Sequence, residues 1–306
     1  MACLVVSSIP SAANTKRQAS GQPVQVQMRN VDLHLDEDSV LRIRHLRGEL
    51  DRTRPGTPPV FDDKNSFTLA IDSADIAIGV DALSRLINRH LSEAGDSPIS
   101  DIRLGVEGSR LTIHGTAHKG IAVPFAVTAE PRVDNGTLRL HPTSVKALGI
   151  PSEGLFSFFH LSLEKLLHIK QPGMRFDGND LLLDPTALLP PPRAQGHLQA
   201  FRVEGDQVVQ QFGPGRKAPL RPPDARSNYM YYRGGILRFG KLTMTDADME
   251  LIDQHSADPF DFFQEHYVDQ LVAGYSKNTR ARGLKVYMPD YRTVASKQPT
   301  PAKPPD

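Results

Sequence analysis

The sequence has very little cysteine, almost no net charge and no long hydrophobic run. Cys3 is the only cysteine among 306 residues, which excludes an internal disulfide and any zinc site built on several cysteines. Lys and Arg number 36 and Asp and Glu number 35, so no net field attracts nucleic acid or an anionic membrane surface. No apolar run approaches the roughly 20 residues that cross a bilayer. We therefore expect a soluble chain that does not bind nucleic acid.

The common signatures of enzymes are also missing. The sequence contains no Gly-x-Ser-x-Gly nucleophile elbow, no phosphate-binding loop and no dinucleotide-binding fingerprint. One Ser-x-x-Lys pattern runs from Ser162 to Lys165, but the Ser-Asp-Asn and Lys-Thr-Gly motifs that accompany it in penicillin-binding enzymes are absent. A four-residue pattern arises easily by chance. The sequence thus predicts a protein that is not an enzyme and has no cofactor.

Two groups of side chains are candidate metal ligands. His114 and His118 lie four residues apart on a predicted strand and so share one face, but no third ligand of suitable spacing is near. Several aspartates between residues 246 and 261 offer oxygens that suit Ca²⁺, although the spacing and the glycine of an EF-hand loop are absent. Ordinary surface roles explain both groups better, so we expect no metal. These aspartates are Asp246, Asp248, Asp253, Asp258 and Asp261.

Composition divides the chain into segments. Residues 1–20 are a signal remnant or a disordered end, because a short apolar stretch precedes small residues but no basic n-region is present. Residues 214–228 are rich in Pro, Gly and basic residues and predict a linker between a domain at 24–213 and a segment at 229–293. Residues 294–306 predict a disordered tail. The partial signal favours a periplasmic or secreted protein, with the cytoplasm as the alternative.

The stretch from residue 98 to residue 213 repeats a sequence pattern that is typical of a strand, a turn and a second strand. Apolar and polar residues alternate on both sides of Val-Glu-Gly at residues 106–108 and again at 203–205, with a looser copy at 133–138. Two strands joined by a short Gly-containing turn form a hairpin. We therefore predict a chain of antiparallel hairpins.

Two further predicted strands, at 24–35 and 67–78, each change the phase of their alternation once. The change falls near Asn30 in the first strand and near Ser73 in the second. A one-residue phase slip is typical of a β-bulge or a strand bend. Both strands are therefore expected to curl, as strands do around a core or a cavity.

Two stretches have the period of a helix. Residues 81–94 place their apolar side chains in one stripe, and residues 152–168, the most hydrophobic stretch, place them on more than one face. Residues 258–263 are expected to lead into a helix that ends near Gly274, with Pro259 in its first turn. The sequence thus predicts an α+β fold, a curled antiparallel β-meander wrapped on one or two long helices, with a smaller C-terminal α+β segment.

The order of these elements resembles a known family. The phrases at 102–106, 111–116 and 123–127, followed by Gly-Thr-Leu-Arg-Leu-His-Pro-Thr-Ser-Val at 136–145, are similar to those of the LmeA-type envelope proteins. The resemblance covers about residues 80–213. It implies a secreted, phospholipid-binding, non-enzymatic protein of the tubular lipid-binding architecture. The chain departs from that pattern in its incomplete signal and in residues 229–293, which have no counterpart.

An apolar groove between a curled sheet and a helix would hold an acyl chain without directional chemistry, since each buried methylene contributes about 0.8 kcal/mol. The ligand would be a lipid or another hydrophobic small molecule, and peripheral contact with a membrane fits this role. Arg85 and Arg89 either meet a headgroup or face solvent. Ordinary core packing is the alternative for each lining residue. The predicted lining consists of Leu83, Ile87, Phe125, Leu155, Phe158, Phe159, Leu163 and Leu166.

A second interpretation is a structural or interaction module with a packed core. In this interpretation the strand that contains Tyr229 to Tyr232 is a docking edge for a protein partner, which the sequence does not identify. The two interpretations differ in one structural feature. Lipid carriage requires a continuous cavity, whereas the interaction module requires none.

Overall fold

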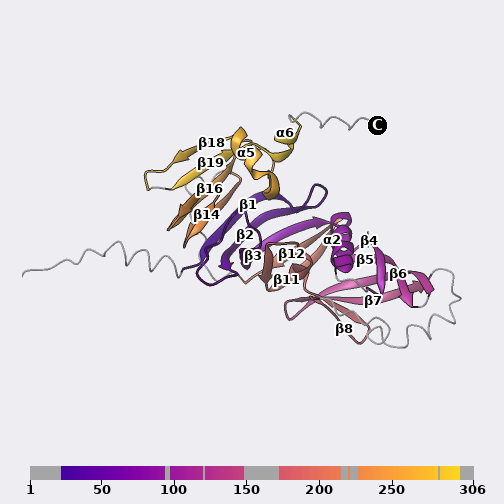
Figure 1. The fold of residues 1–306 in the computed structure, drawn as a ribbon. Helices are drawn as coiled ribbons and strands as arrows, with labels where there is room; N and C mark the ends of the chain where they lie inside the picture. The colour runs from indigo at the N-terminus through magenta and orange to yellow at the C-terminus, as the bar shows by residue number, and fades with distance from the viewer. Residues whose placement is uncertain are drawn as a thin grey trace, which may run out of the picture.

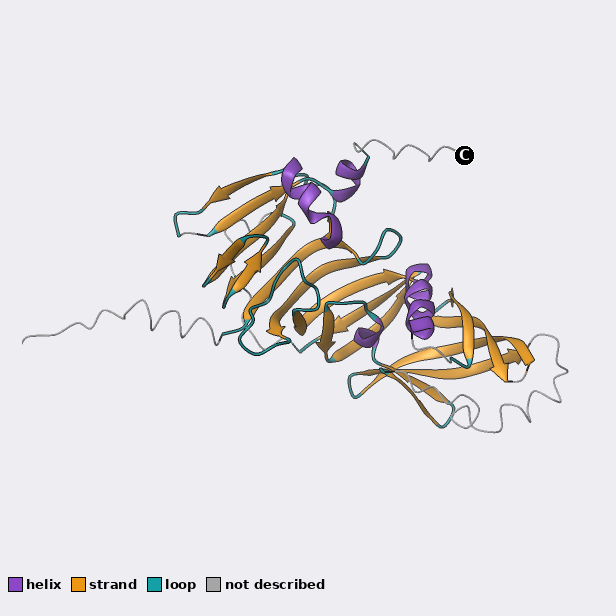
Figure 2. Cartoon of the chain, in the orientation of Figure 1, coloured by secondary structure: helices purple, strands orange, loops and turns teal. Residues whose placement is uncertain are grey.

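The computed structural model describes residues 22–93, 97–119, 121–147, 172–214, 220, 227–281 and 283–296. The described chain is mostly β-structure, with mainly antiparallel sheets and a few short helices (Figures 1 and 2). The expected antiparallel sheets are confirmed. The wrapping of the sheet around one or two long helices stays a prediction, because the second predicted helix, at 152–168, lies outside the described residues.

The larger sheet has eleven strands and combines segments from both ends of the chain. Nine strands follow one another in the order β11-β12-β3-β2-β1-β13-β16-β19-β18, while β10 pairs with β3 and β17 with β1. The strands are β1 (Val24–His34), β2 (Val40–Arg52), β3 (Phe67–Gly79), β10 (Arg193–Gly196), β11 (Leu198–Glu204), β12 (Gln207–Phe212), β13 (Tyr229–Gly234), β16 (Ala247–Asp253), β17 (Phe260–Phe263), β18 (Tyr275–Asn278) and β19 (Leu284–Met288).

The predicted irregularities in β1 and β3 are confirmed. Asn30 has a φ of 51° and interrupts the pairing of β1 with β2. The pairing of β2 with β3 shifts beside Ser73, between Arg47 and Gly48. A register shift of this kind bends a strand and increases its twist. In β1 the register with β2 is the same on both sides of Asn30, so the irregularity there is a local break in the ladder and not a bulge.

The smaller sheet has six strands in the order β4-β5-β6-β7-β9-β8. Its hairpins turn where the repeated phrase places glycine, and Gly108 and Gly136 have positive φ values of 62° and 80°. Glycine adopts this left-handed region without steric cost. The strands are β4 (Ile99–Glu107), β5 (Arg110–Lys119), β6 (Ile121–Asp134), β7 (Thr137–Ala147), β8 (Met174–Asp177) and β9 (Asp180–Leu183).

The remaining elements are short, apart from one helix that lies at the edge of the smaller sheet (Figure 2). This helix, α2 (Val80–Glu93), confirms the predicted helix at 81–94. The others are the ribbon β14 (Leu237–Phe239) with β15 (Leu242–Met244), the short helices η1 (Pro185–Leu188) and η2 (Gln264–His266), and the helices α5 (Tyr267–Ala273) and α6 (Tyr291–Ala295).

The expectation that residues 258–263 lead directly into a helix is wrong. Phe260–Phe263 form β17, a strand parallel to β1, and α5 begins only at Tyr267. All four residues of β17 are buried. Burial on both faces is typical of a strand inside a sheet, and a short apolar run of this kind does not distinguish a strand from a helix.

The strand with the tyrosines is not a docking edge either. β13 is hydrogen-bonded to β1 on one side and to β16 on the other, so it lies inside the larger sheet. Tyr229, Tyr231 and Tyr232 are buried. Residues 229–288 therefore continue the sheet that residues 24–79 begin, and of the predicted linker Leu220 donates its backbone N–H to Oε1 of Gln27 in β1.

Candidate functional site

A cavity of about 160 Å³ lies where α2 and the β11–β12 hairpin meet the inner face of the smaller sheet. Its lining is almost entirely aliphatic and aromatic. The residues are Leu83, Ile87, Leu91, Ile99, Ile102, Leu104, Leu111, Ile113, Ala117, His118, Val123, Phe125, Val127, Ala129, Leu138, Leu140, Pro142, Met174, Phe176, Asn179, Leu181, Leu183, Pro185, Leu188, Phe201 and Gln210.

Alternation along the strands produces this wall. Successive side chains of a strand point to opposite faces of the sheet, and Val123, Phe125, Val127 and Ala129 of β6 all line the cavity. Ile113 lies opposite Val127 in the β5–β6 ladder. Each inward residue is followed by one that is absent from the lining. The period-two pattern in the sequence therefore supplies one wall of the cavity.

Phe125 reaches over the neighbouring strand because that strand carries a glycine. Gly115 is the direct partner of Phe125 in the β5–β6 ladder. A Cβ atom at Gly115 would lie 2.8 Å from Cζ of Phe125 and 2.7 Å from Cδ1 of Ile102. A side chain at this position would therefore displace the ring. Glycine at this position sets the place of the aromatic side chain in the wall.

Helix α2 forms the opposite wall and is attached to the edge strand β4 by side-chain hydrogen bonds. Nδ2 of Asn88 donates to O of Ile102 at 2.7 Å, and Oδ1 of Asn88 accepts from N of Ile102 at 2.8 Å. Oγ of Ser84 accepts from N of Leu104 at 2.8 Å. A bulge in β4 leaves Ile102 without a partner in the β5 ladder. The side-chain amide of Asn88 therefore makes the two backbone hydrogen bonds that a neighbouring strand would make. Sequence analysis missed both residues, although their i, i+4 spacing beside an apolar stripe is a usable signal.

Replacing Asn88 with alanine is expected to destabilise the protein by about 1–3 kcal/mol, because the polar backbone groups of buried Ile102 lose their partner. Urea denaturation checks this value. Ser92→Ala, which removes only an exposed hydrogen bond to O of Arg89, is the control and should change stability by less than about 0.5 kcal/mol. Equal effects of the two changes would show that α2 is not held through Asn88.

The described residues of the lining include few polar side chains. These are His118, Asn179 and Gln210, and no Lys, Arg, Asp or Glu is among the described lining residues. Nε2 of His118 lies 2.9 Å from Oγ of Ser100, which donates to Oδ2 of Asp101 at 2.8 Å. A mostly apolar cavity with a few polar groups is the usual form of a small-molecule site.

The predicted lining residues divide into two groups. Leu83, Ile87 and Phe125 line the cavity as expected. The arginines of α2 do not belong to it, since Arg89 pairs with Asp36 and Arg85 donates to a backbone carbonyl in the β1–β2 turn. The other predicted residues, Leu155, Phe158, Phe159, Leu163 and Leu166, lie outside the described residues.

The fold separates only some of the candidate metal ligands, because Asp253, Asp258 and Asp261 all lie close enough to Asp290 to raise its pKa. His118 hydrogen-bonds to Ser100, and Asp248 accepts from the Tyr231 hydroxyl and pairs with Arg233. In the described part of the chain one group brings metal-ligating atoms together, within 4.8 Å of one another. It consists of Asp253, His255 and Asp290. Burial, with a further contribution from neighbouring aspartates, raises the pKa of Asp290 to about 6.

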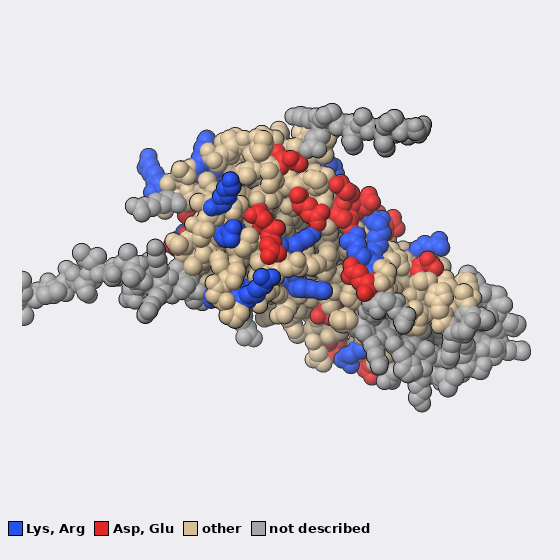
Figure 3. Space-filling model, in the orientation of Figure 1, with Lys and Arg blue, Asp and Glu red and all other residues tan. Residues whose placement is uncertain are grey.

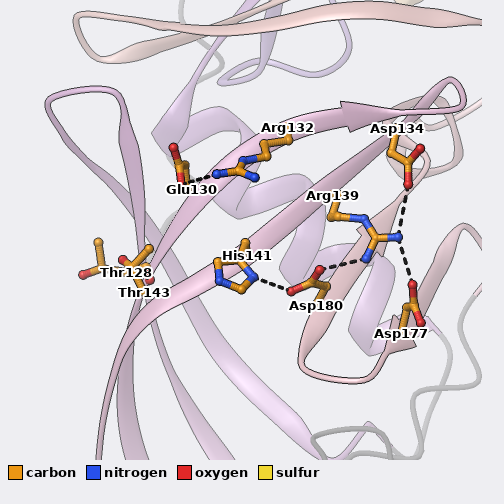
Figure 4. Close-up of polar contacts among 9 residues, drawn as sticks. All are labelled: Thr128, Glu130, Arg132, Asp134, Arg139, His141, Thr143, Asp177 and Asp180. Carbon is orange, nitrogen blue, oxygen red and sulfur yellow. Dashed lines mark hydrogen bonds and ion pairs between the residues drawn. The ribbon is translucent and has the colours of Figure 1, made fainter.

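On the outer face of the smaller sheet, away from the cavity, charged side chains form a network of hydrogen-bonded ion pairs (Figure 4). The Arg139 guanidinium donates to Asp134, Asp177 and Asp180 at 3.1, 2.9 and 2.7 Å, and Nδ1 of His141 donates to Asp180 at 2.7 Å. Partial burial raises the pKa of Asp180, but the hydrogen bonds from Arg139 and His141 outweigh it and lower that pKa overall. These contacts join β7, β8 and β9 behind the cavity and hold its wall in shape.

Charge is mixed elsewhere on the surface, where Lys and Arg alternate with Asp and Glu over the face in Figure 3. Among the residues that the structure describes, no helix is long and apolar enough to span a membrane.

Comparison with family models, curated proteins and solved structures found no match. The function is therefore inferred from the geometry of the cavity.

Proposed function

We propose that the protein binds or carries a phospholipid or another acyl-chain ligand in the bacterial envelope, without catalysis, by burying the chain in this cavity. The observation that carries the proposal is the lining, which is mostly apolar and, among the residues that the structure describes, has no carboxylate, ammonium or guanidinium group. A charged ligand group would lose its hydration there and find no counter-ion. Only the apolar part of a ligand fits such a wall.

The free energy of burial is sufficient for this role. One buried methylene contributes about 0.8 kcal/mol, so about ten contribute about 8 kcal/mol. That sum corresponds to a micromolar dissociation constant before the cost of ordering the ligand. Apolar burial alone can therefore hold one chain without a directional contact.

The arrangement of elements supports the same proposal. The resemblance to LmeA-type envelope proteins implies a meander of hairpins beside a helix. Here α2 packs along the edge strand β4 of the smaller sheet, and both line the cavity. In this proposal the smaller sheet curls around α2 and the groove between them holds the lipid. The envelope location belongs to the same proposal and follows from the partial signal in the sequence.

Native mass spectrometry of the purified protein, followed by organic extraction and lipid analysis, tests the proposal. A stoichiometric adduct with the mass of an acyl-chain lipid is the expected result. A clean mass of the protein alone, unchanged after incubation with phospholipid vesicles, would exclude the proposed role.

A second candidate function, docking of a protein partner, is favoured by one feature of the C-terminal segment. β18 is the last strand of the larger sheet, and all four of its residues are exposed. An exposed edge can accept a further strand. A partner that pairs there should be lost when Ser276 is replaced by proline, which removes a backbone donor, whereas lipid binding should be unchanged.

A further inference from the structure

Exposed apolar side chains are concentrated at one end of the larger sheet. Among the described residues four large apolar side chains are exposed, and three of them, Val268, Val272 and Tyr275, lie close together in the chain. Their exposed fractions are 51%, 80% and 48%. They belong to α5 and to the start of the edge strand β18 (Figure 1). Clustered apolar residues on a surface mark an interaction site, whereas scattered ones need no explanation.

Helix α5 carries apolar side chains on both of its faces. Tyr267 and Gln270 are buried, and Leu271 packs against the core. Val268 and Val272 are four residues apart and share the opposite face. A surface helix normally has polar side chains there. This outer face therefore gains free energy when an apolar environment replaces water.

Cations without a carboxylate partner follow these residues in the chain. Residues 270–288 contain four Lys or Arg and no Asp or Glu, although the whole chain is almost neutral. Lys277 and Arg280 are exposed, and in the described part of the chain neither pairs with a carboxylate. Nζ of Lys277 lies 5.2 Å from the ring centroid of Tyr275, which stacks on Tyr287 with centroids 4.7 Å apart. Positive charge, an aromatic ring and exposed valines thus occur together in α5 and the β18–β19 hairpin.

Three acids close to this segment already have partners. On β16, Asp248 pairs with Arg233 at 3.3 Å. Glu250 of the same strand pairs with Lys285 at 3.9 Å. Asp269, the only acid of α5, contacts the histidine of η2 at 3.6 Å. The two exposed cations of β18 and its turn therefore have no fixed counter-ion among the described residues.

We propose that α5 and the β18–β19 hairpin form a docking surface for an anionic phospholipid membrane. Lys277 and Arg280 meet the lipid phosphates, while the exposed valines and the Tyr275 ring enter the boundary between headgroups and acyl chains. Tyrosine suits this boundary because its ring is apolar and its hydroxyl is polar. A nucleic acid offers phosphates but no hydrocarbon for the valines, so the membrane accounts for both kinds of side chain.

Docking at this surface leaves the cavity free. The end of the molecule with α5 and β18 lies opposite the end with the smaller sheet (Figure 1). A membrane bound at one end therefore does not cover the cavity at the other. The inference goes beyond the proposed function and does not depend on what the cavity holds.

Flotation of the full chain with vesicles tests the docking surface. The protein should bind vesicles made of equal parts of phosphatidylglycerol and phosphatidylcholine, and it should not bind vesicles of phosphatidylcholine alone. Binding should weaken as NaCl is raised, because salt screens exposed charges. Equal binding to both kinds of vesicle would overturn the proposal. Binding to neither would also overturn it, while a lipid adduct in native mass spectrometry would leave the proposed function standing.

Two matched double variants assign the binding to these cations. Lys277→Gln with Arg280→Gln should weaken vesicle binding about thirtyfold, since each cation near an anionic surface contributes about 1 kcal/mol. Arg103→Gln with Arg110→Gln removes the same charge from two exposed positions of the smaller sheet and should leave binding nearly unchanged. Equal losses in both double variants would show that net charge determines binding, which would overturn the assignment to this surface.

The valines distinguish a membrane from other polyanions. Val272→Ser should weaken vesicle binding about tenfold, which corresponds to about 1.4 kcal/mol and to burial of about half of one valine side chain. Val272→Leu keeps an apolar side chain and should bind at least as tightly as the wild type. Because Val272 is exposed, neither change affects the core. Undiminished binding by Val272→Ser would show that the surface binds phosphates alone, as a nucleic-acid site does, and would overturn the proposal.

Discussion

Replacing Val127 with tryptophan is expected to abolish ligand binding. Val127 lies in the middle of the β6 wall, opposite Ile113, so an indole there fills the centre of the cavity. A chain that loses the place of about four methylenes loses about 3 kcal/mol, which weakens binding more than about hundredfold. Native mass spectrometry of the variant after incubation with phospholipid vesicles measures this loss.

The control for this variant is its neighbour on β6. Thr128 is absent from the cavity lining, and its carbonyl accepts from the Thr143 hydroxyl on the outer face (Figure 4). Thr128→Trp places the same indole on the same strand outside the cavity and should leave binding unchanged. Overpacking costs about 1–3 kcal/mol, so the folding of both variants is compared by urea denaturation. Undiminished binding by a folded Val127→Trp protein would contradict the location of the site.

Replacing His34 with alanine is expected to destabilise the protein by about 3–5 kcal/mol. His34 and Asp261 form a buried pair at 2.5 Å, with side chains 2% and 9% exposed. Removing one partner of a buried pair leaves the other charge uncompensated. The ring also packs against Phe263 and Tyr291, with centroids 5.4 and 5.2 Å away. Urea denaturation measures the loss, and His45→Ala, an exposed histidine of β2, should cost less than about 0.5 kcal/mol.

The same pair predicts a dependence of stability on pH. Burial raises the pKa of Asp261, but hydrogen bonds from His34 and from N of Arg292, with their charges, lower it overall. A carboxyl whose pKa is lower in the folded state stabilises the protein above its unfolded pKa of about 3.9 and loses that contribution as pH falls through the folded pKa. The stability difference between wild type and Asp261→Asn should therefore shrink on acidification below about pH 4. A difference that is constant from pH 7 to pH 3 would show that ionised Asp261 contributes nothing.

The sequence predicts those parts of the fold that local patterns determine. Alternation places Phe125 in the cavity wall, helical spacing places Leu83 and Ile87 on the opposite wall, and the phase slip near Ser73 marks a shift in the register of β2 with β3. In each case the face on which a side chain lies depends only on the residues next to it in the chain. The periodicity of the sequence is therefore enough to predict these features.

The features that sequence analysis missed depend on distant partners. Phe260–Phe263 is a strand because β1, more than two hundred residues earlier, pairs with it. Asn88 is a structural residue because a bulge in β4 brings the backbone of Ile102 to its amide. The hydrogen-bond partner of His118, Ser100, lies across the β4–β5 ladder and eighteen residues earlier in the chain. No local pattern indicates which partner a polar side chain will meet.

The position of β1 inside the larger sheet has a consequence for synthesis on the ribosome. One side of β1 pairs with β2, which follows directly, but its other side pairs with β13 and β17 from the last third of the chain. At about 5–20 residues per second, the roughly 200 intervening residues take about 10–40 s to appear. Throughout that time β1 has an unpaired edge, which is a template for aggregation. The nascent chain therefore exposes this edge until its C-terminal third emerges.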